Sequence, residues 1–139
     1  MNKEIIERFK AYCIELDLGD VSMLNEFYAD EIIFKDPIHA INGIDNLREY
    51  FKKLNDNLNA GSFQFMDESV VDNKVYLSWE LNLQLKRPKK NVKASGMSVL
   101  VIDDKIVSHR DYFDAGELFY ENIPVLGSII RSLKKKIAK

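Results

Sequence analysis

The sequence predicts an α+β fold, a cone in which helices near the N-terminus wrap a curved, mainly antiparallel sheet. Three observations lead to this prediction. Apolar residues recur every three or four positions up to about residue 60, alternate with polar residues from there to about residue 114, and then form a final helical stripe. Helices gathered in one part of a chain and strands in the next are typical of α+β packing.

The first part of the chain contains three candidate helices and one short strand. Gly19 ends the first helix, Asp20 caps a short second helix, and Gly43 opens the third. The short strand covers 32–34 and stops before Pro37. The apolar positions that define the helices are Ile5, Ile6, Phe9, Tyr12, Cys13 and Leu16, then Met23, Leu24, Phe27 and Tyr28, then Ile44, Leu47, Tyr50, Phe51, Leu54 and Leu58.

Four long strands are predicted next, at about 62–72, 74–87, 91–103 and 105–114. The turns between them are short and polar, so consecutive strands are expected to pair antiparallel. A long antiparallel sheet twists and curls, and helices that close its concave side leave a pocket at the open end.

Composition is that of one ordinary folded domain. The chain has 139 residues, of which 46% are apolar and 30% are charged. No signal peptide or stretch of 18 apolar residues is recognisable. Cys13 is the single cysteine, so an internal disulfide is excluded and a reducing, cytoplasmic location is expected.

The net charge of −2 hides a difference between two parts of the chain. Residues 122–139 carry five basic side chains and no acidic one, whereas residues 1–121 carry 15 basic and 22 acidic side chains. We therefore predict a cone domain over 1–121, extended by a basic amphipathic helix over 122–139. The acidic body argues against a nucleic-acid partner.

Asp36 stands where the short strand leaves the sheet. Phe34 and Asp36 have the same strand parity, so an inward Phe34 implies an inward Asp36. A carboxyl group buried beside aromatic rings is suited to proton abstraction. The alternative is a turn in which the Asp36 carboxylate accepts hydrogen bonds from nearby backbone amides, and the spacing alone favours that alternative.

The last strand carries a second polar group. Its alternation places His109 and Asp111 on one face together with Val107 and Phe113, which indicates that this face points inward. An inward His and Asp are costly to bury unless they bond each other or a ligand. The pattern allows three interpretations. The two residues form a functional patch, or they are a satisfied structural pair, or the strand has the opposite parity and both residues lie at a dimer interface.

Two short motifs resemble known families. The run HRDYFD at 109–114 resembles the Trp-Arg-Asp-Tyr-Phe-Asp signature of limonene epoxide hydrolase-like proteins, which implies that Asp111 is a catalytic acid and that His109 replaces a Trp lining the pocket. Phe34 and Asp36 stand where that family has a Tyr and an Asn that hold the attacking water. The run Lys35-Asp36-Pro37 before a helix also resembles ketosteroid isomerase, which implies that Asp36 is a proton-shuttling base.

The chain also departs from both families. Residues 79–81 read Trp-Glu-Leu where the epoxide hydrolase pattern has Arg-x-Asp, and residues 96–100 contain no Asp to form the oxyanion hole of the isomerase. Tyr12 is the one candidate for the Tyr of that hole. As a fold, the resemblance runs from 5 to about 120 and implies a nuclear transport factor 2-like cone of the SnoaL-like kind.

The predicted function is the binding of a small, mostly apolar molecule, with proton transfer of the isomerase, cyclase, dehydratase or epoxide hydrolase type. Asp36 is the expected general base, Asp111 the acid or second carboxylate, and His109 the residue that tunes it. The expected pocket lining is Tyr12, Phe34, Trp79 and Phe113. The alternative is a non-catalytic ligand-binding or protein-interaction domain.

No cofactor is implied, and no metal site is expected. Asp36 and His39 have a spacing that suits metal binding, but the chain has two histidines in all and no cysteine near them.

Two surfaces are expected to contact other molecules. Met97, Val99 and Val101 share one strand face, which predicts a homodimer through the convex side of the sheet. The terminal helix carries an apolar stripe and basic residues, which suit either an anionic membrane or the acidic body and a partner subunit. The second alternative is favoured, with the helix covering the mouth of the pocket. The stripe consists of Leu126, Ile129, Ile130, Leu133 and Ile137.

Overall fold

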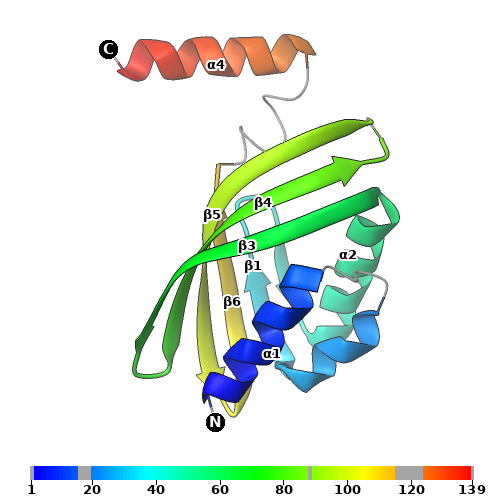
Figure 1. Ribbon diagram of the computed structural model, residues 1–139, viewed down its shortest axis with the longest axis vertical. Coiled ribbons are helices and arrows are strands. Elements are labelled where there is room, and N and C mark those ends of the chain that lie inside the picture. The colour runs from blue at the N-terminus through cyan, green and yellow to red at the C-terminus, as the bar shows by residue number, and fades with distance from the viewer. Residues whose placement is uncertain (1, 16–19, 88, 115–123, 139) are drawn as a thin grey trace.

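The computed structural model describes residues 2–15, 20–87, 89–114 and 124–138, and shows helices packed against one curved sheet (Figure 1). In chain order the elements are α1 (Asn2–Glu15), a 3₁₀ helix (Val21–Glu26), β1 (Tyr28–Lys35), β2 (Ala40–Asn42), α2 (Ile44–Asp56), β3 (Leu58–Val71), β4 (Lys74–Leu85), β5 (Lys90–Asp103), β6 (Lys105–Phe113) and α4 (Pro124–Ala138).

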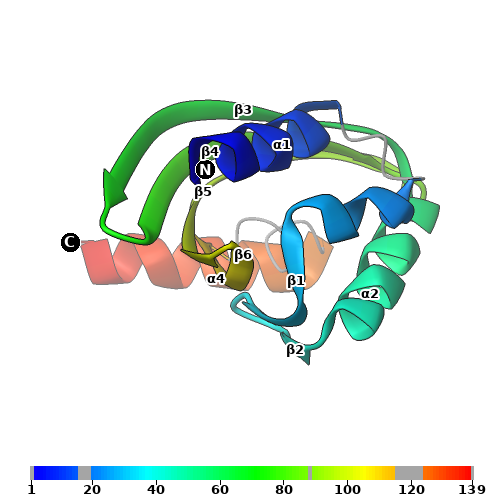
Figure 2. The same cartoon turned by 90° about the horizontal axis from the view of Figure 1, so that it is seen from below.

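The six strands form a single sheet in the order β2-β1-β6-β5-β4-β3. The β1–β6 pair is parallel, and every other pair is antiparallel. Figure 2 shows the sheet curving around the side on which α1 and α2 lie. The predicted α+β class, with a curved, mainly antiparallel sheet and helices on its concave side, is confirmed.

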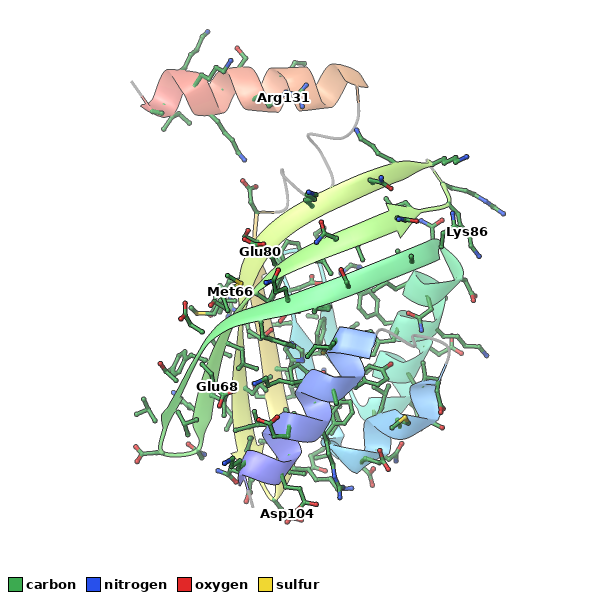
Figure 3. The ribbon with its side chains drawn as sticks, viewed as in Figure 1. Met66, Glu68, Glu80, Lys86, Asp104 and Arg131 are labelled. Carbon is green, nitrogen blue, oxygen red and sulfur yellow. The ribbon has the colours of Figure 1, made fainter. Side chains whose placement is uncertain are left out.

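The tight turns of the meander fall where the sequence places them. Asp72, between β3 and β4, has φ 56°, and Asp104, between β5 and β6, has φ 66°. Aspartate tolerates this left-handed region better than most residues, because its short side chain bonds locally to the backbone. Asp104 and Lys86 mark opposite ends of the sheet (Figure 3).

The region before α2 differs from the prediction. Tyr28 begins β1 instead of ending a helix, and the helical segment is a short 3₁₀ turn that stops at Glu26. The cause is long-range pairing: the Phe27 carbonyl accepts a hydrogen bond from the Ile106 amide at 2.8 Å, and Tyr28 pairs with Ile106. The chain then reverses through Asp36 into β2, a strand that was not predicted.

Side chains on the concave side form two core clusters. The larger one, here called the helix-side core, joins α1, α2, β1 and the Asp104 end of β4 to β6. The smaller one, here called the sheet-end cluster, lies toward the Lys86 end of the sheet. Its buried members are Leu58, Trp79, Leu81, Leu83, Val92 and Ala94, and its partly exposed members are Leu54, Phe63, Phe65, Leu85 and Phe113.

The terminal helix α4 lies beyond the sheet end that carries Lys86 (Figure 3). Lys134 on α4 donates a hydrogen bond to the Asp114 carboxylate. Ile129, Leu133 and Ile137 are exposed. None of the described helices is long and apolar enough to cross a membrane.

Candidate functional site

A chain of hydrogen bonds from four strands meets at Asp111. The Tyr28 hydroxyl lies 2.6 Å from His109 Nδ1, and His109 Nε2 lies 2.6 Å from Asp111 Oδ1. From the other side, Trp79 Nε1 donates to Ser98 Oγ at 2.9 Å, and Ser98 Oγ donates to the same Asp111 Oδ1 at 2.5 Å. Trp79, Ser98 and His109 are buried, which makes this a polar network within an apolar interior.

Strand register brings these side chains together. Ser98 on β5 pairs directly with Asp111 on β6, so their side chains emerge on the same face as neighbours. Trp79 on β4 pairs with Gly96, and a Cβ at Gly96 would collide with the tip of the Trp79 ring. Glycine is therefore needed at position 96, because its bare backbone lets the indole lie across β5 and reach Ser98.

The protons along this chain can be assigned from the hydrogen bonds. Burial raises the pKa of the Tyr28 phenol well above its usual value, and negative charge at Cys13, Asp111 and Tyr12 raises it further. Tyr28 thus keeps its proton. We assign its hydroxyl as the donor to Nδ1 of His109, which corresponds to the tautomer that carries its proton on Nε2 and donates it to Asp111.

Asp111 is left with one open oxygen. Oδ1 accepts hydrogen bonds from His109 and Ser98, whereas Oδ2 has no hydrogen-bond partner among the described residues. The Asp111 side chain is 15% exposed, compared with 5% for His109. This geometry fits a carboxylate that is held firmly through one oxygen and exchanges a proton through the other.

Aromatic rings fix the orientation of His109. Phe34 and Phe9 meet the imidazole edge to face, with ring centroids 4.9 and 5.3 Å away, and Tyr28 stacks on it at 5.9 Å. These contacts leave the ring little freedom to rotate, so its two nitrogens keep their separate partners.

Asp36 is also buried, with its side chain 4% exposed, but its hydrogen bonds are local. Its carboxylate accepts hydrogen bonds from the backbone amides of Ile38 at 2.8 Å and His39 at 2.6 Å, and from the Tyr50 hydroxyl at 3.4 Å. The His39 ring lies 3.1 Å away. These contacts match the alternative predicted from the sequence, a turn in which the Asp36 carboxylate accepts hydrogen bonds from nearby backbone amides. Burial raises the pKa of the Tyr50 phenol, and the charges of Asp36 and Asp111 raise it further.

A family model described as the SnoaL-like domain matches residues 9–109, which is well over half of the chain. The chain belongs to the SnoaL-like family. No curated protein matches the sequence.

Three solved structures illustrate what this SnoaL-like chain is similar to. A putative SnoaL-like polyketide cyclase from Jannaschia sp. CCS1 is 14% identical, covering 81% of this chain and 85% of the other, with a TM-score of 0.71. An epoxide hydrolase of the limonene type from M. tuberculosis is 18% identical, covering 84% and 83%, with a TM-score of 0.71. A ketosteroid isomerase-like protein from Catenulispora acidiphila, in complex with trimethylamine, is 12% identical, covering 83% and 88%, with a TM-score of 0.73. The TM-scores show a shared fold, and at identities this low the likeness extends to the fold alone.

The four lining residues expected from the sequence fall into two groups in this SnoaL-like chain. Trp79 and Phe113 belong to the sheet-end cluster. Phe34 is buried beneath His109, and Tyr12 packs against Phe27 with ring centroids 5.3 Å apart, so both belong to the helix-side core. Trp79 contacts Phe113 and is linked to Asp111 through Ser98, whereas Phe34 and Tyr12 lie in the other cluster.

Two residues of the network were missed from the sequence. The sequence pattern predicts a helix at Tyr28, so it does not predict that the Tyr28 hydroxyl meets His109. Ser98 has a usable signal, because it lies two residues before the buried Leu100 and therefore faces inward on the same strand. A small polar residue at an inward position, opposite an inward Asp, indicates a hydrogen bond between them.

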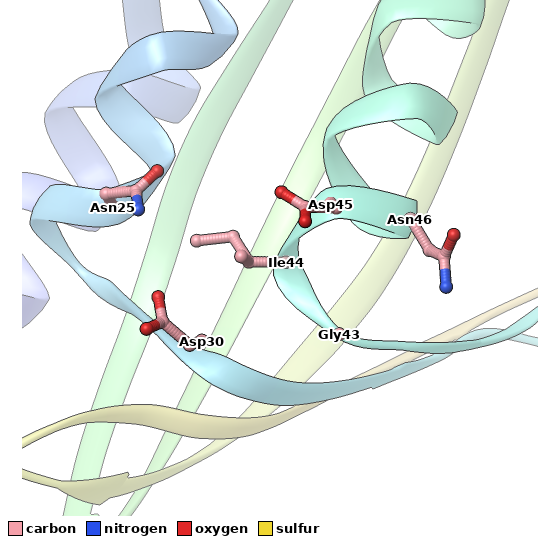
Figure 4. A pocket seen from close by; sticks show the side chains of 6 residues that line it. All are labelled: Asn25, Asp30, Gly43, Ile44, Asp45 and Asn46. Atoms are coloured by element: carbon pink, nitrogen blue, oxygen red, sulfur yellow. The ribbon is translucent and has the colours of Figure 1, made fainter.

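Two surface hollows lie elsewhere on this SnoaL-like fold. One of about 430 Å³ lies at the start of α2 (Figure 4), where Arg48 bonds both Asn25 and Asp45. The other, of about 290 Å³, lies across β3, β4 and β5. Neither is lined by Asp36, His109 or Asp111, so a pocket at the predicted site stays a prediction. The first is lined by Asn25, Asp30, Gly43, Ile44, Asp45 and Asn46.

Proposed function

We propose that the chain binds a small, mostly apolar molecule and moves a proton to or from it through Asp111. One observation carries this proposal: Asp111 is anchored by two buried donors on Oδ1, and its Oδ2 has no hydrogen-bond partner in the part of the chain that the structure describes. A carboxylate in such a setting takes or gives a proton without losing its position. Membership of the SnoaL-like family supports a catalytic role with a small molecule.

The neighbours of Asp111 have separate tasks in this proposal. His109 and Ser98 hold Oδ1, and Tyr28 holds His109 in the Nε2–H tautomer that points at the carboxylate. When Oδ2 accepts a proton from a C–H or O–H group, Asp111 becomes neutral while both anchoring bonds persist. Isomerisation, aldol-type cyclisation, dehydration and epoxide opening all use such a step.

The substrate class follows from the wall beside Asp111. Phe63 meets Trp79 edge to face at 5.2 Å, Phe65 stacks on Phe63 at 5.9 Å, and Phe113 lies 6.4 Å from Trp79. Phe63, Phe65 and Phe113 are all partly exposed. Exposed aromatic faces favour a flat, apolar ligand, which we place against this wall with its reacting atom at Asp111 Oδ2.

Asp36 enters the proposal as the second carboxylate. Its Oδ1 is occupied by backbone amides, and its Oδ2 accepts from the Tyr50 hydroxyl. We therefore assign Asp36 the task of holding Tyr50, whose raised pKa keeps the phenol neutral and its hydroxyl directed at the carboxylate.

A panel of epoxide, ketosteroid and polyketide-like substrates tests the proposal with Asp111→Asn and Asp36→Asn. The first change removes the proton acceptor, so kcat is expected to fall by about 10²- to 10⁴-fold while ligand affinity holds. Asp36→Asn is expected to lower kcat less, because the turn keeps one acceptor oxygen. Asp56→Asn, at an exposed position on α2, is the matched control and should keep wild-type rates.

The second candidate is a ligand-binding domain without chemistry. The observation in its favour is that Trp79, Glu80 and Leu81 stand where epoxide hydrolases have their Arg-x-Asp pair. Ligand binding with no turnover in the wild type, or turnover unchanged in Asp111→Asn, supports this candidate and rejects the first.

We also propose that the protein forms a homodimer in the cytoplasm. Met97 and Tyr112 are register neighbours on the outer face of the sheet, 40% and 49% exposed, and Ile33 on the same face is 52% exposed. Light scattering should give twice the chain mass of 16.1 kDa, and a monomeric mass would reject the dimer. The single, partly buried Cys13 fits a reducing compartment.

A further inference from the structure

The terminal helix α4 presents an aliphatic stripe to solvent. Ile129, Leu133 and Ile137 follow one another at intervals of four residues, and their exposed fractions are 52%, 52% and 84%. Side chains four apart lie on one face of a helix. Three adjacent aliphatic residues exposed on one helix face indicate a surface that is covered in the working state of the protein.

The basic residues of α4 are placed around this stripe in a definite pattern. With about 100° of rotation per residue, Lys136 and Lys134 lie roughly 60° and 100° to either side of Leu133. Arg131 and Lys135 lie roughly 160° away from it, on the opposite face. The stripe is therefore flanked by one lysine on each side, and Arg131 and Lys135 add positive charge to the opposite face.

This arrangement matches the interface of an anionic membrane. Such an interface offers hydrocarbon for Leu133 and its neighbours and phosphate groups for the flanking lysines, whose long stems reach upward from a shallow helix. At 15 residues the helix is about 22 Å long, too short to span a bilayer and suited to lying in its plane.

The acidic body of the chain is a weaker match. It offers charge for the lysines, and Lys134 already bonds Asp114, but Ile129, Leu133 and Ile137 stay exposed when that bond is made. Charge complementarity and burial of the stripe are satisfied together only when the helix meets a surface that is both anionic and apolar.

We propose that α4 binds the surface of an anionic membrane, with Ile129, Leu133 and Ile137 among the acyl chains and the lysines at the head groups. This inference does not depend on the proposed proton transfer. It assigns the terminal helix the task of bringing the domain to the bilayer, where small apolar molecules concentrate.

Co-sedimentation of the full-length protein with vesicles tests the proposal. Vesicles of equal parts phosphatidylcholine and phosphatidylglycerol should bind the protein, and vesicles of phosphatidylcholine alone should not. Lys134→Gln/Lys136→Gln removes the two cations that flank the stripe and should weaken partitioning by about 25-fold, because each contributes about 1 kcal/mol. Leu133→Ser/Ile137→Ser should abolish binding, and 0.5 M salt should weaken it in the wild type.

Matched changes elsewhere serve as controls. Lys52→Gln/Lys53→Gln makes the same charge change on the exposed face of α2, and Ile14→Ser removes an aliphatic residue that is 50% exposed on α1. Both should bind vesicles as the wild type does. The proposal is overturned if the wild type fails to bind anionic vesicles, if the α4 variants bind equally well, or if the α4 variants change the oligomeric mass while vesicle binding stays constant.

Discussion

Asp36 and Asp111 are both shielded carboxylates, but their hydrogen-bond partners give them different roles. The amide donors of Asp36 lie two and three residues away along the chain, so its environment is a local turn. The donors of Asp111 arrive from two strands, and their own partners come from two more. A local turn is readable from the run Asp-Pro, whereas a network assembled across a sheet requires the register.

The phenol that supports this network makes stability depend on pH in the alkaline range. In the folded state the pKa of Tyr28 is raised above its ordinary value of 10.0, so folded Tyr28 keeps its proton where the unfolded chain loses it. The pKa values of Tyr50 and of the Cys13 thiol are also raised, and burial is the largest cause for both. The free energy of unfolding should therefore show no loss from the two tyrosines below about pH 10 and should fall above it.

Urea denaturation between pH 8 and pH 11 measures this effect. Each such group contributes a slope of up to about 1.4 kcal/mol per pH unit, so Tyr28→Phe should reduce the alkaline slope. Tyr112→Phe removes an exposed phenol and should keep the wild-type slope. An alkaline slope that Tyr28→Phe leaves unchanged would show that the buried phenol is not the source.

At the scale of elements, β4, β5 and β6 act as a frame that sets distances in the site. Their alternation was visible in the sequence, and the inward positions Val75, Leu77 and Trp79 on β4 are buried as expected. The direct pairing of Ser98 with Asp111 follows once the β5–β6 turn is placed at Asp104. Turn placement therefore decides which polar side chains meet, because a shift by one residue turns every side chain to the other face.

Gly96 on β5 is the point at which this frame admits the Trp79 ring. A methyl group there would collide with the indole and approach the Tyr112 carbonyl to 2.6 Å, so Gly96→Ala should cost about 1–3 kcal/mol of stability. It should also displace the indole from Ser98. Because Trp79 is the single tryptophan, its fluorescence emission reports the displacement directly.

The control for this prediction is Asn91→Ala, at an exposed position of the same strand. It should change neither stability nor emission by a measurable amount. A Gly96→Ala protein with wild-type stability and emission would mean that the Trp79 ring has free space beside β5.

At the scale of the whole molecule, the fold class could be predicted from the sequence, but the pairing of β1 with β6 could not. Periodicity identified α1, α2 and the long strands β3 to β6, since each has a regular apolar pattern of its own. The parallel pairing of β1 with β6 joins residues about 75 positions apart, and nothing in the local pattern near Tyr28 reports it. The same pairing sets His109 beside Phe34 and within reach of Tyr28, so half of the site depended on contacts that only the folded chain reveals.

The central claim is that the buried donors are ordered toward Asp111, with Tyr28 donating to His109 and His109 donating to the carboxylate. Long-range ¹H–¹⁵N NMR of the imidazole rings at pH 8 tests this claim, and His39→Gln identifies the His109 signals because the chain has two histidines. The account predicts a His109 ring with its proton on Nε2 and an unprotonated Nδ1, and a mixture of tautomers in Tyr28→Phe. A His109 ring that carries its proton on Nδ1 in the wild type would contradict the account, because His109 would then have no proton to donate to Asp111.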